Sequence, residues 1–161
     1  MDIWFSSDHH FGHANIIKYC NRPYNSVVHM NSILESNWNS VVKQKDRVYY
    51  LGDFAMHPNI VSEVLPRLNG SKILIAGNHD KCHGGSERWI EHYMEAGFTS
   101  IQNQMNLEIA GEEVLLHHFP YRSEKAEPDQ KHYNFRPIDK GGWLIHGHVH
   151  QRWKMLKKQI N

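Results

Sequence analysis

Five short apolar runs in this chain each end in polar or titratable residues, and this recurrence constrains the fold more than any other feature. The clearest run covers residues 72–76 and leads directly into Gly77-Asn78-His79-Asp80. The other four lead into Asp8-His9-His10, Gly52-Asp53, His117-His118 and His146-Gly147-His148-Val149-His150. Such groups cost free energy when they are buried without partners. We therefore expect the runs to be strands whose ends meet at one site.

Length, charge and cysteine content narrow the class of protein. A chain of 161 residues fits one domain, 1–161, with a sizeable core. The net charge of +1 argues against extended nucleic acid as a partner. The two cysteines form no disulfide framework, and no apolar run has the length of a membrane span. These features predict a cytoplasmic protein without a membrane partner.

The order of predicted elements indicates an α/β fold. Strands are expected at 2–7, 48–51 and 72–76, alternating with helices at 14–20, 30–42 and 61–68, the last shortened by Pro66. Ser86 is predicted to cap a further helix that ends at Gly97. Strands follow at 99–103, 106–110, 113–117 and 143–145, with a long loop over 119–140. The first half predicts a parallel sheet and the second half an antiparallel one.

The strand ends bring together nitrogen and oxygen donors that suit metal ions. The donors are Asp8, His10, Asp53, Asn78, His118, His148 and His150. Seven donors exceed the needs of one ion and suit two, with one carboxylate shared. Because no cysteine is among them, we expect manganese first, with iron, zinc, nickel or cobalt as alternatives to it. Two ions about 3.5–4 Å apart can clamp a phosphoryl group.

The ordered series Asp8-x-His10, Gly52-Asp53, Gly77-Asn78-His79-Asp80, His118 and Gly147-His148-x-His150 resembles the calcineurin-like metallophosphoesterase superfamily. The opening Asp8-His9-His10-Phe11-Gly12-His13 is similar to its small bacterial and phage members. The resemblance implies a two-sheet β-sandwich flanked by helices (α/β/β/α). It also implies that Asp8, His10 and His150 hold the first ion, that Asn78, His118 and His148 hold the second, and that Asp53 bridges them.

The resemblance further implies a mechanism, in which a hydroxide shared by the ions attacks phosphorus and His79 acts as general acid. Relatives place an acid or histidine three residues after the bridging aspartate to orient that histidine, whereas this chain has Met56. Asp80, His13 and His57 are the remaining candidates for this role, and none of them is required to fill it. His13 and Arg22 are predicted to bind the substrate phosphate.

The favoured function is hydrolysis of a small phosphodiester, such as a cyclic or short nucleotide. Alternatives are a phosphomonoesterase, a nuclease acting on nucleic-acid ends, and a non-catalytic binding module stabilised by metal. Only 11 residues follow His150, which predicts a shortened C-terminal sheet with an open edge. We accordingly expect a monomer or a homodimer.

Overall fold

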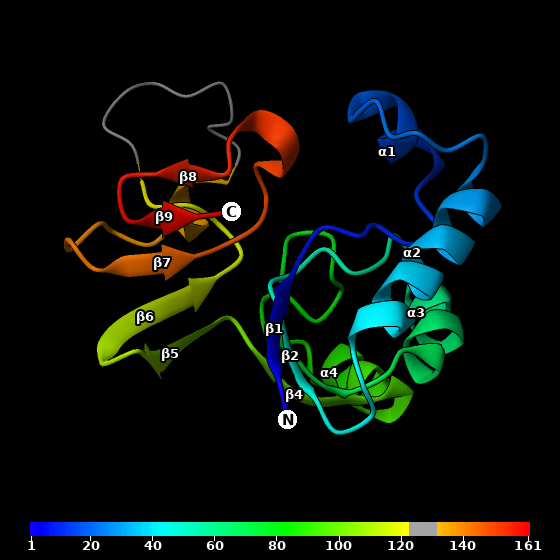
Figure 1. Ribbon diagram of the computed structural model, residues 1–161, viewed down its shortest axis with the longest axis horizontal. Helices are drawn as coiled ribbons and strands as arrows, with labels where there is room; N and C mark the ends of the chain where they lie inside the picture. The colour runs from blue at the N-terminus through cyan, green and yellow to red at the C-terminus, as the bar shows by residue number, and fades with distance from the viewer. Residues whose placement is uncertain (123–131) are drawn as a thin grey trace.

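A computed structural model of the protein contains two β-sheets packed face to face (Figure 1). It describes residues 1–122 and 132–161, so the predicted loop over 119–140 lies partly outside the described residues. The first sheet has the order β1-β2-β3-β4 and is parallel throughout. Its strands are β1 (Ile3–Ser6), β2 (Arg47–Tyr50), β3 (Ser71–Ile75) and β4 (Phe98–Gln102). The sequence assigned residues 99–103 to the second sheet, which is wrong, because β4 pairs with β3.

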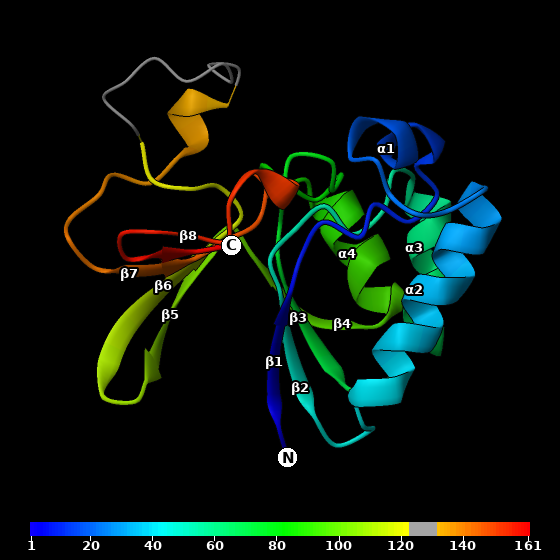
Figure 2. The same ribbon diagram turned by 45° about the horizontal axis from the view of Figure 1, so that its top comes forward.

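Helices cover the outer face of this first sheet, as Figure 2 shows for α2, α3 and α4. The helices are α1 (Ala14–Tyr19), α2 (Val27–Val41), α3 (Pro58–Val64) and α4 (Glu87–Ala96). Pro66 ends α3 as predicted, and the chain continues as the 3-10 turn η1 (Leu65–Arg67). Gly97 ends α4 with φ 126°, a conformation that a side chain would oppose. Ser86 stands at the start of α4, but its side chain makes no capping hydrogen bond, contrary to the prediction.

The second sheet has the order β5-β6-β7-β9-β8 and mixes both strand directions. Its strands are β5 (Gln104–Ile109), β6 (Glu112–His117), β7 (Trp143–Ile145), β8 (Met155–Leu156) and β9 (Gln159–Ile160). The β5–β6 pair is antiparallel as predicted, and the β8–β9 pair is antiparallel too, whereas β6–β7 and β7–β9 are parallel. The prediction of an antiparallel second sheet is therefore wrong for its central pairs, β6–β7 and β7–β9. The residues after His150, to which no strand was assigned, supply β8 and β9.

Two separate apolar clusters hold these layers together. The larger lies between the helices and the first sheet and includes Trp38, Tyr50 and Phe54. The smaller lies between the sheets and includes Tyr49 and Leu116. Tyr49 and Tyr50 point to opposite faces because successive side chains alternate along a strand. Burying a large apolar side chain contributes about 1.5–3 kcal/mol, so both interfaces stabilise the fold.

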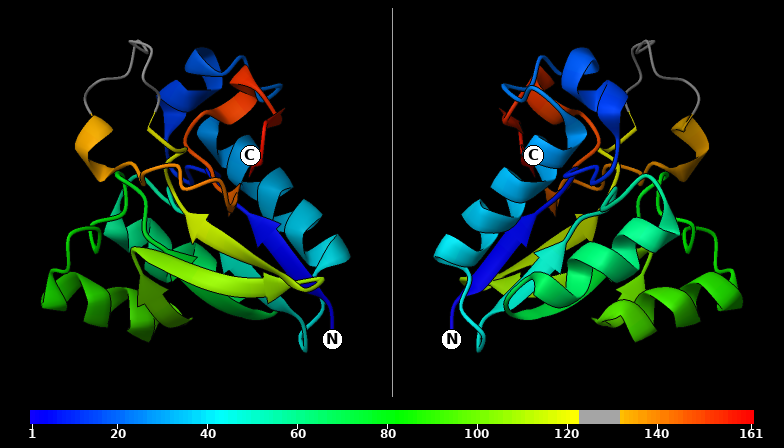
Figure 3. Two further views of the ribbon diagram at one scale, coloured as in Figure 1. Left: turned by 90° about the vertical axis from the view of Figure 1, so that its left-hand side faces the viewer. Right: turned by 90° about the vertical axis from the view of Figure 1, so that its right-hand side faces the viewer.

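The outer face of the second sheet differs from the expected arrangement. No α-helix of the described residues lies over β5 and β6 there (Figure 3, left). The chain around Tyr121 lies against the sheet instead, where its N–H donates to Gln159 Oε1 at 2.7 Å. The 3-10 turns η2 (Tyr133–Phe135) and η3 (His150–Arg152) complete the described elements. The two-sheet α/β fold is confirmed, with its α-helical layer on one side.

The loops that leave β1, β2 and β3 run towards the loops that leave β6 and β7, at one end of the molecule (Figures 1 and 2). Main-chain hydrogen bonds join neighbouring loops: Asp8 N–H donates to Gly52 O at 2.9 Å, and Gly147 N–H donates to His118 O at 3.0 Å. The predicted meeting of strand ends is therefore confirmed. None of the described helices combines the length and apolarity needed to cross a membrane.

Candidate metal centre

The predicted donors form adjoining groups, each with ligand atoms within 4.8 Å of one another. These groups are Asp8-His10-His150, Asp53-His118-His148 and His10-Asp53-His79. Asn78 joins the second group, because its Oδ1 lies 3.2 Å from His118 Nε2. Donors from five loops thus lie side by side, among them His10 and His150, which are 140 residues apart in sequence. Two of the groups correspond to the two ligand sets that the family resemblance implies.

Asp53 lies between these two groups. Its Oδ2 is 3.7 Å from His10 Nε2 and 3.5 Å from His118 Nε2. Its Oδ1 accepts a hydrogen bond from His79 N–H at 2.8 Å, which fixes the carboxylate plane. One oxygen therefore faces a histidine of each group, which is the position that a bridging ligand must occupy.

One carboxylate oxygen of Asp8 accepts a hydrogen bond, and the other accepts none from the described residues. Oδ2 accepts from His148 N–H at 2.9 Å. Oδ1 is buried, makes no hydrogen bond, and lies 3.7 Å from His10 Nε2 and 3.5 Å from His150 Nε2. A buried oxygen in this state costs about 1–3 kcal/mol unless something satisfies it. A cation between Asp8, His10 and His150 would do so.

The backbone at the donors is strained. Five of the seven have positive φ angles between 52° and 70°: Asp8, His10, Asp53, His148 and His150. A residue with a side chain costs roughly 1–2 kcal/mol in this left-handed region. Such strain clusters where the surrounding structure serves function rather than stability. The loops thus turn sharply at the donors and aim these side chains inward.

Two glycines allow the loops to approach each other. A Cβ on Gly77 would collide with the Asp53 carboxylate and with His118 Cε1, and one on Gly52 would meet His118 Nδ1 at 2.5 Å. The collision comes from this close approach, since only Gly52 of the two has a positive φ, at 89°.

The charges of the centre favour a cation. Burial raises the pKa of Asp53, but His118 and neighbouring histidines outweigh it and hold that pKa below its ordinary value. Burial lowers the pKa of His118, but Asp53 and Asp8 outweigh it and raise the pKa to about 9. The two carboxylates therefore favour the protonated form of the buried His118 imidazole. A metal ion would supply the same positive charge and displace that proton.

His79 stands beside these groups with its ring towards two other imidazoles. Its ring centroid lies 5.1 Å from that of His10 and 6.0 Å from that of His13. No hydrogen bond to the His79 ring is present among the described residues. His57 is exposed at the start of α3. Orientation of His79 by a hydrogen bond from Asp80, His13 or His57 is therefore not part of this structure.

The Asp80 carboxylate holds main chain in place and does not orient the His79 ring, the role for which the sequence made it a candidate. Its Oδ2 accepts from Asp53 N–H at 2.8 Å and Gly77 N–H at 2.9 Å, and its Oδ1 accepts from Phe54 N–H at 3.0 Å. Burial and the Asp53 carboxylate raise its pKa to about 7, although the N–H groups of Gly77 and Phe54 act in the opposite direction. Asp80 thus ties the loop after β2 to the loop after β3.

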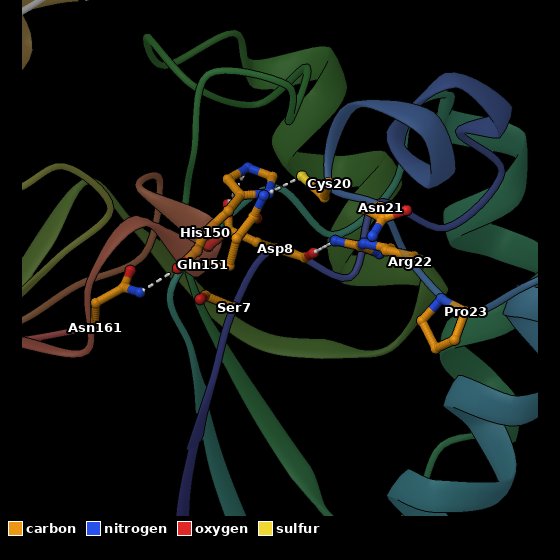
Figure 4. Close-up of a pocket in the computed structure, with 9 residues that line it drawn as sticks. All are labelled: Ser7, Asp8, Cys20, Asn21, Arg22, Pro23, His150, Gln151 and Asn161. Carbon is orange, nitrogen blue, oxygen red and sulfur yellow. Dashed lines mark hydrogen bonds and ion pairs between the residues drawn. The ribbon is translucent and has the colours of Figure 1, made fainter.

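Arg22 also contacts main chain rather than open space. Its two terminal nitrogens donate to Asp8 O and His9 O, each at 2.7 Å. It lines a pocket of about 370 Å³ beside Asp8 and His150 (Figure 4). The guanidinium therefore supports the strained loop after β1. Its contact with a substrate phosphate stays a prediction.

The histidines that neighbour the donors pack as structural groups. His9 Nδ1 lies 2.7 Å from Tyr50 Oη. His117 Nδ1 accepts from Phe119 N–H at 3.0 Å, and the His146 ring packs against Trp153 at 4.8 Å. Burial is the main cause that lowers the pKa of all three to about 4. They are neutral at physiological pH, and each contacts an aromatic or main-chain partner.

Two further residues, Cys20 and His132, lie at the edge of the centre. Cys20 Sγ lies 3.1 Å from His150 Nδ1 (Figure 4). The His132 ring stacks on Phe119 at 5.5 Å and meets the edge of His148 at 5.5 Å. Neither lies at a strand end, so the pattern that identified the other donors gave no signal for them.

Comparisons with known proteins place this geometry in a family. The sequence model of the calcineurin-like phosphoesterase superfamily domain matches residues 1–160. An uncharacterised protein of Methanocaldococcus jannaschii, MJ1445, is 40% identical over 151 residues, which are 92% of this chain and 69% of that protein. The Gene 66 protein of Mycobacterium phage L5 is 32% identical over 163 residues, covering 92% of this chain and 77% of that protein.

A solved structure is similar along almost the whole chain. The protein of unknown function AQ665 from Aquifex aeolicus superposes with a TM-score of 0.67 at 30% sequence identity. The similarity covers 98% of this chain and 83% of that one. Both the sequence and the fold therefore match along the segments that carry the donors.

Proposed function

Because the chain belongs to the calcineurin-like phosphoesterase superfamily, we propose that it is a metal-dependent hydrolase that cleaves a small phosphodiester. The position of Asp53 carries this proposal. One carboxylate oxygen faces His10 on one side and His118 on the other, at 3.7 and 3.5 Å. A pair of cations that shares one aspartate is the arrangement suited to phosphoryl chemistry.

The residues present fit two divalent ions. Asp8, His10 and His150 would hold one, and Asn78, His118 and His148 would hold the other, with Asp53 shared. The partnerless, buried Asp8 Oδ1 supports a cation in the first position. Nitrogen and oxygen donors without cysteine support manganese, iron, zinc, nickel or cobalt, and we propose manganese first.

The ions, when bound, polarise the phosphate oxygens and lower the pKa of a bound water towards neutrality. The His79 ring lies beside the donors. His79 is half-buried, and its ring makes no hydrogen bond with any described side chain. We assign to it the donation of a proton to the leaving oxygen, a role worth roughly 10²–10⁴ in rate. His13, whose ring is 6.0 Å from that of His79, would meet the substrate phosphate.

A diester fits the charges better than a monoester. A monoester carries two negative charges near neutral pH, and a diester carries one. Arg22 directs two of its five N–H groups to the carbonyl oxygens of Asp8 and His9 at 2.7 Å, so fewer of its donors are left for a second phosphate charge. This commitment of Arg22 supports the diester.

A substrate panel with several metals tests the proposal. Bis(p-nitrophenyl) phosphate, p-nitrophenyl phosphate, cyclic nucleotides and short DNA or RNA would each be assayed with Mn²⁺, Zn²⁺ and Ni²⁺. We expect turnover of the small diesters and a lower kcat/KM for the monoester. Activity on nucleic acid alone that falls steeply with salt would identify a nuclease instead. Metal binding without turnover of any substrate would contradict the enzymatic proposal.

A further inference from the structure

His150 presents its two ring nitrogens to different neighbours. Nε2 lies 3.3 Å from His10 Nε2 and 3.5 Å from Asp8 Oδ1, on the side of the first proposed ion. Nδ1 lies 3.1 Å from Cys20 Sγ, on the opposite side of the ring (Figure 4). Within the described residues, His150 Nδ1 has no other hydrogen bond. The ring therefore stands between the centre and one thiol.

Metal binding decides which ring nitrogen carries the proton. A neutral imidazole that binds an ion through Nε2 keeps its hydrogen on Nδ1, and that N–H is normally held by an acceptor. We propose that Cys20 is this acceptor, a positioning residue that holds His150 Nε2 towards Asp8 and His10. The buried Asp8 Oδ1, which has no hydrogen-bond partner, independently marks the place that Nε2 faces.

Local structure holds the sulfur in place. Cys20 directly follows α1, and its N–H donates to Ile16 O at 3.0 Å. The next residue, Asn21, has a positive φ of 46° that turns the chain towards Arg22. Arg22 in turn is anchored on the carbonyl oxygens of Asp8 and His9. Cys20 and the loop that carries Asp8 are therefore fixed relative to each other.

The two proposed ions would then differ in how firmly a histidine holds them. His118 Nδ1, in the second group, lies 2.7 Å from Leu51 O, a strong main-chain acceptor. Sulfur is a weak acceptor. The first ion, held by His150, is accordingly the more exchangeable of the two, and its affinity depends on Cys20.

The inference rests on the proposed metal centre, and chelator competition tests both separately. Mn²⁺ binding would be measured for the wild type, Cys20→Ala, Cys20→Ser and Cys82→Ala. We expect Cys20→Ala to lower the affinity of the weaker site by about 10–100-fold. Cys20→Ser, which keeps an acceptor atom, recovers most of the loss. Cys82→Ala is the control for loss of a thiol, because Cys82 belongs to the larger apolar cluster between the helices and the first sheet, and we expect its removal to leave both affinities unchanged.

The outcomes separate the two ideas. A wild type that binds no Mn²⁺ refutes the metal centre itself. A wild type that binds two ions with a Cys20→Ala protein of equal affinity refutes only the role of Cys20.

If Cys20→Ala does not fold, ¹⁵N NMR of histidine-labelled wild type loaded with Zn²⁺ can show which ring nitrogen of His150 binds the metal and which carries the proton. Metal on His150 Nε2 with a proton on Nδ1 supports the assignment. Metal on Nδ1 overturns it.

Discussion

Replacing Asp80 separates a structural role from a catalytic one. The buried carboxylate accepts three main-chain N–H groups, from Asp53, Phe54 and Gly77, at 2.8–3.0 Å. Asp80→Ala leaves all three donors without their acceptor. A buried donor without a partner costs about 1–3 kcal/mol, so the free energy of unfolding should fall by about 3 kcal/mol or more.

Asp80→Asn should cost less, because an amide oxygen can replace Oδ2 and keep the bonds from Asp53 and Gly77. The amide NH₂ would then face Phe54 N–H, donor against donor. One lost hydrogen bond corresponds to about 1–3 kcal/mol. The order of stability is therefore wild type, Asp80→Asn, then Asp80→Ala.

Denaturant unfolding of metal-free protein measures this order, and chelator competition measures the effect on metal binding. Because Asp53 donates one of the N–H groups that the Asp80 carboxylate accepts, we expect both variants to weaken Mn²⁺ binding as well. Asp46→Ala is the control. The Asp46 carboxylate also accepts three N–H groups, from Asp2, Lys43 and Trp4, at the opposite end of the first sheet. Its loss should lower stability and leave metal affinity unchanged.

Two results would refute this reasoning. One is an Asp80→Ala protein as stable as Asp80→Asn. The other is an Asp80→Asn protein with wild-type stability and metal affinity but a strongly reduced kcat, which would return Asp80 to the catalytic role that the sequence suggested.

Four further predictions follow from the centre and its surroundings. Asp53→Asn should weaken both metal sites, and elemental analysis that finds two full ions with normal turnover would contradict the bridge. His79→Ala should slow esters with poor leaving groups by roughly 10²–10⁴ and nitrophenyl esters much less; equal slowing of both would remove its role as acid. Gly77→Ala should lower metal affinity, because the added Cβ meets Asp53 and His118; calorimetric titration that matches wild type would show that the loops can move apart. Burial lowers the pKa of His117 and His146 from 6.5 to about 4, so the unfolded chain binds more protons between these values. The contribution of these two histidines is fully present above pH 6.5 and is lost as pH falls, by about 2 kcal/mol per histidine at pH 5; an NMR titration in which either ring of the folded protein titrates near 6.5 would contradict it.

The sequence predicts the grouping of the candidate donors well because these residues follow strands. An apolar run that ends in Asp-x-His or Gly-Asn-His-Asp places its polar residues at a sheet edge, whatever the connections between strands. The site could thus be expected from Asp8, Asp53 and Asn78 before the topology was known. Apolar residues three and four positions apart predicted helices in the same way, and Pro66 predicted the end of α3.

The sequence predicts strand partners and supporting contacts poorly. β4 has the short length of its neighbours, and only its pairing with β3 places it in the parallel sheet. The parallel pairing of β6 with β7 depends on the long connection between them, which carries no periodic signal. Arg22 contacts main-chain oxygens, and Cys20 contacts a ring nitrogen. Both contacts depend on loop geometry, so no residue spacing in the sequence predicts them.

The most direct test of the account is anomalous diffraction from crystals grown with Mn²⁺. We predict two manganese peaks about 3.5–4 Å apart, one on each side of the Asp53 carboxylate, with His150 Nε2 on one ion and His118 Nε2 on the other. A single peak, or two peaks that do not share Asp53, would contradict the dinuclear centre on which the proposed activity depends.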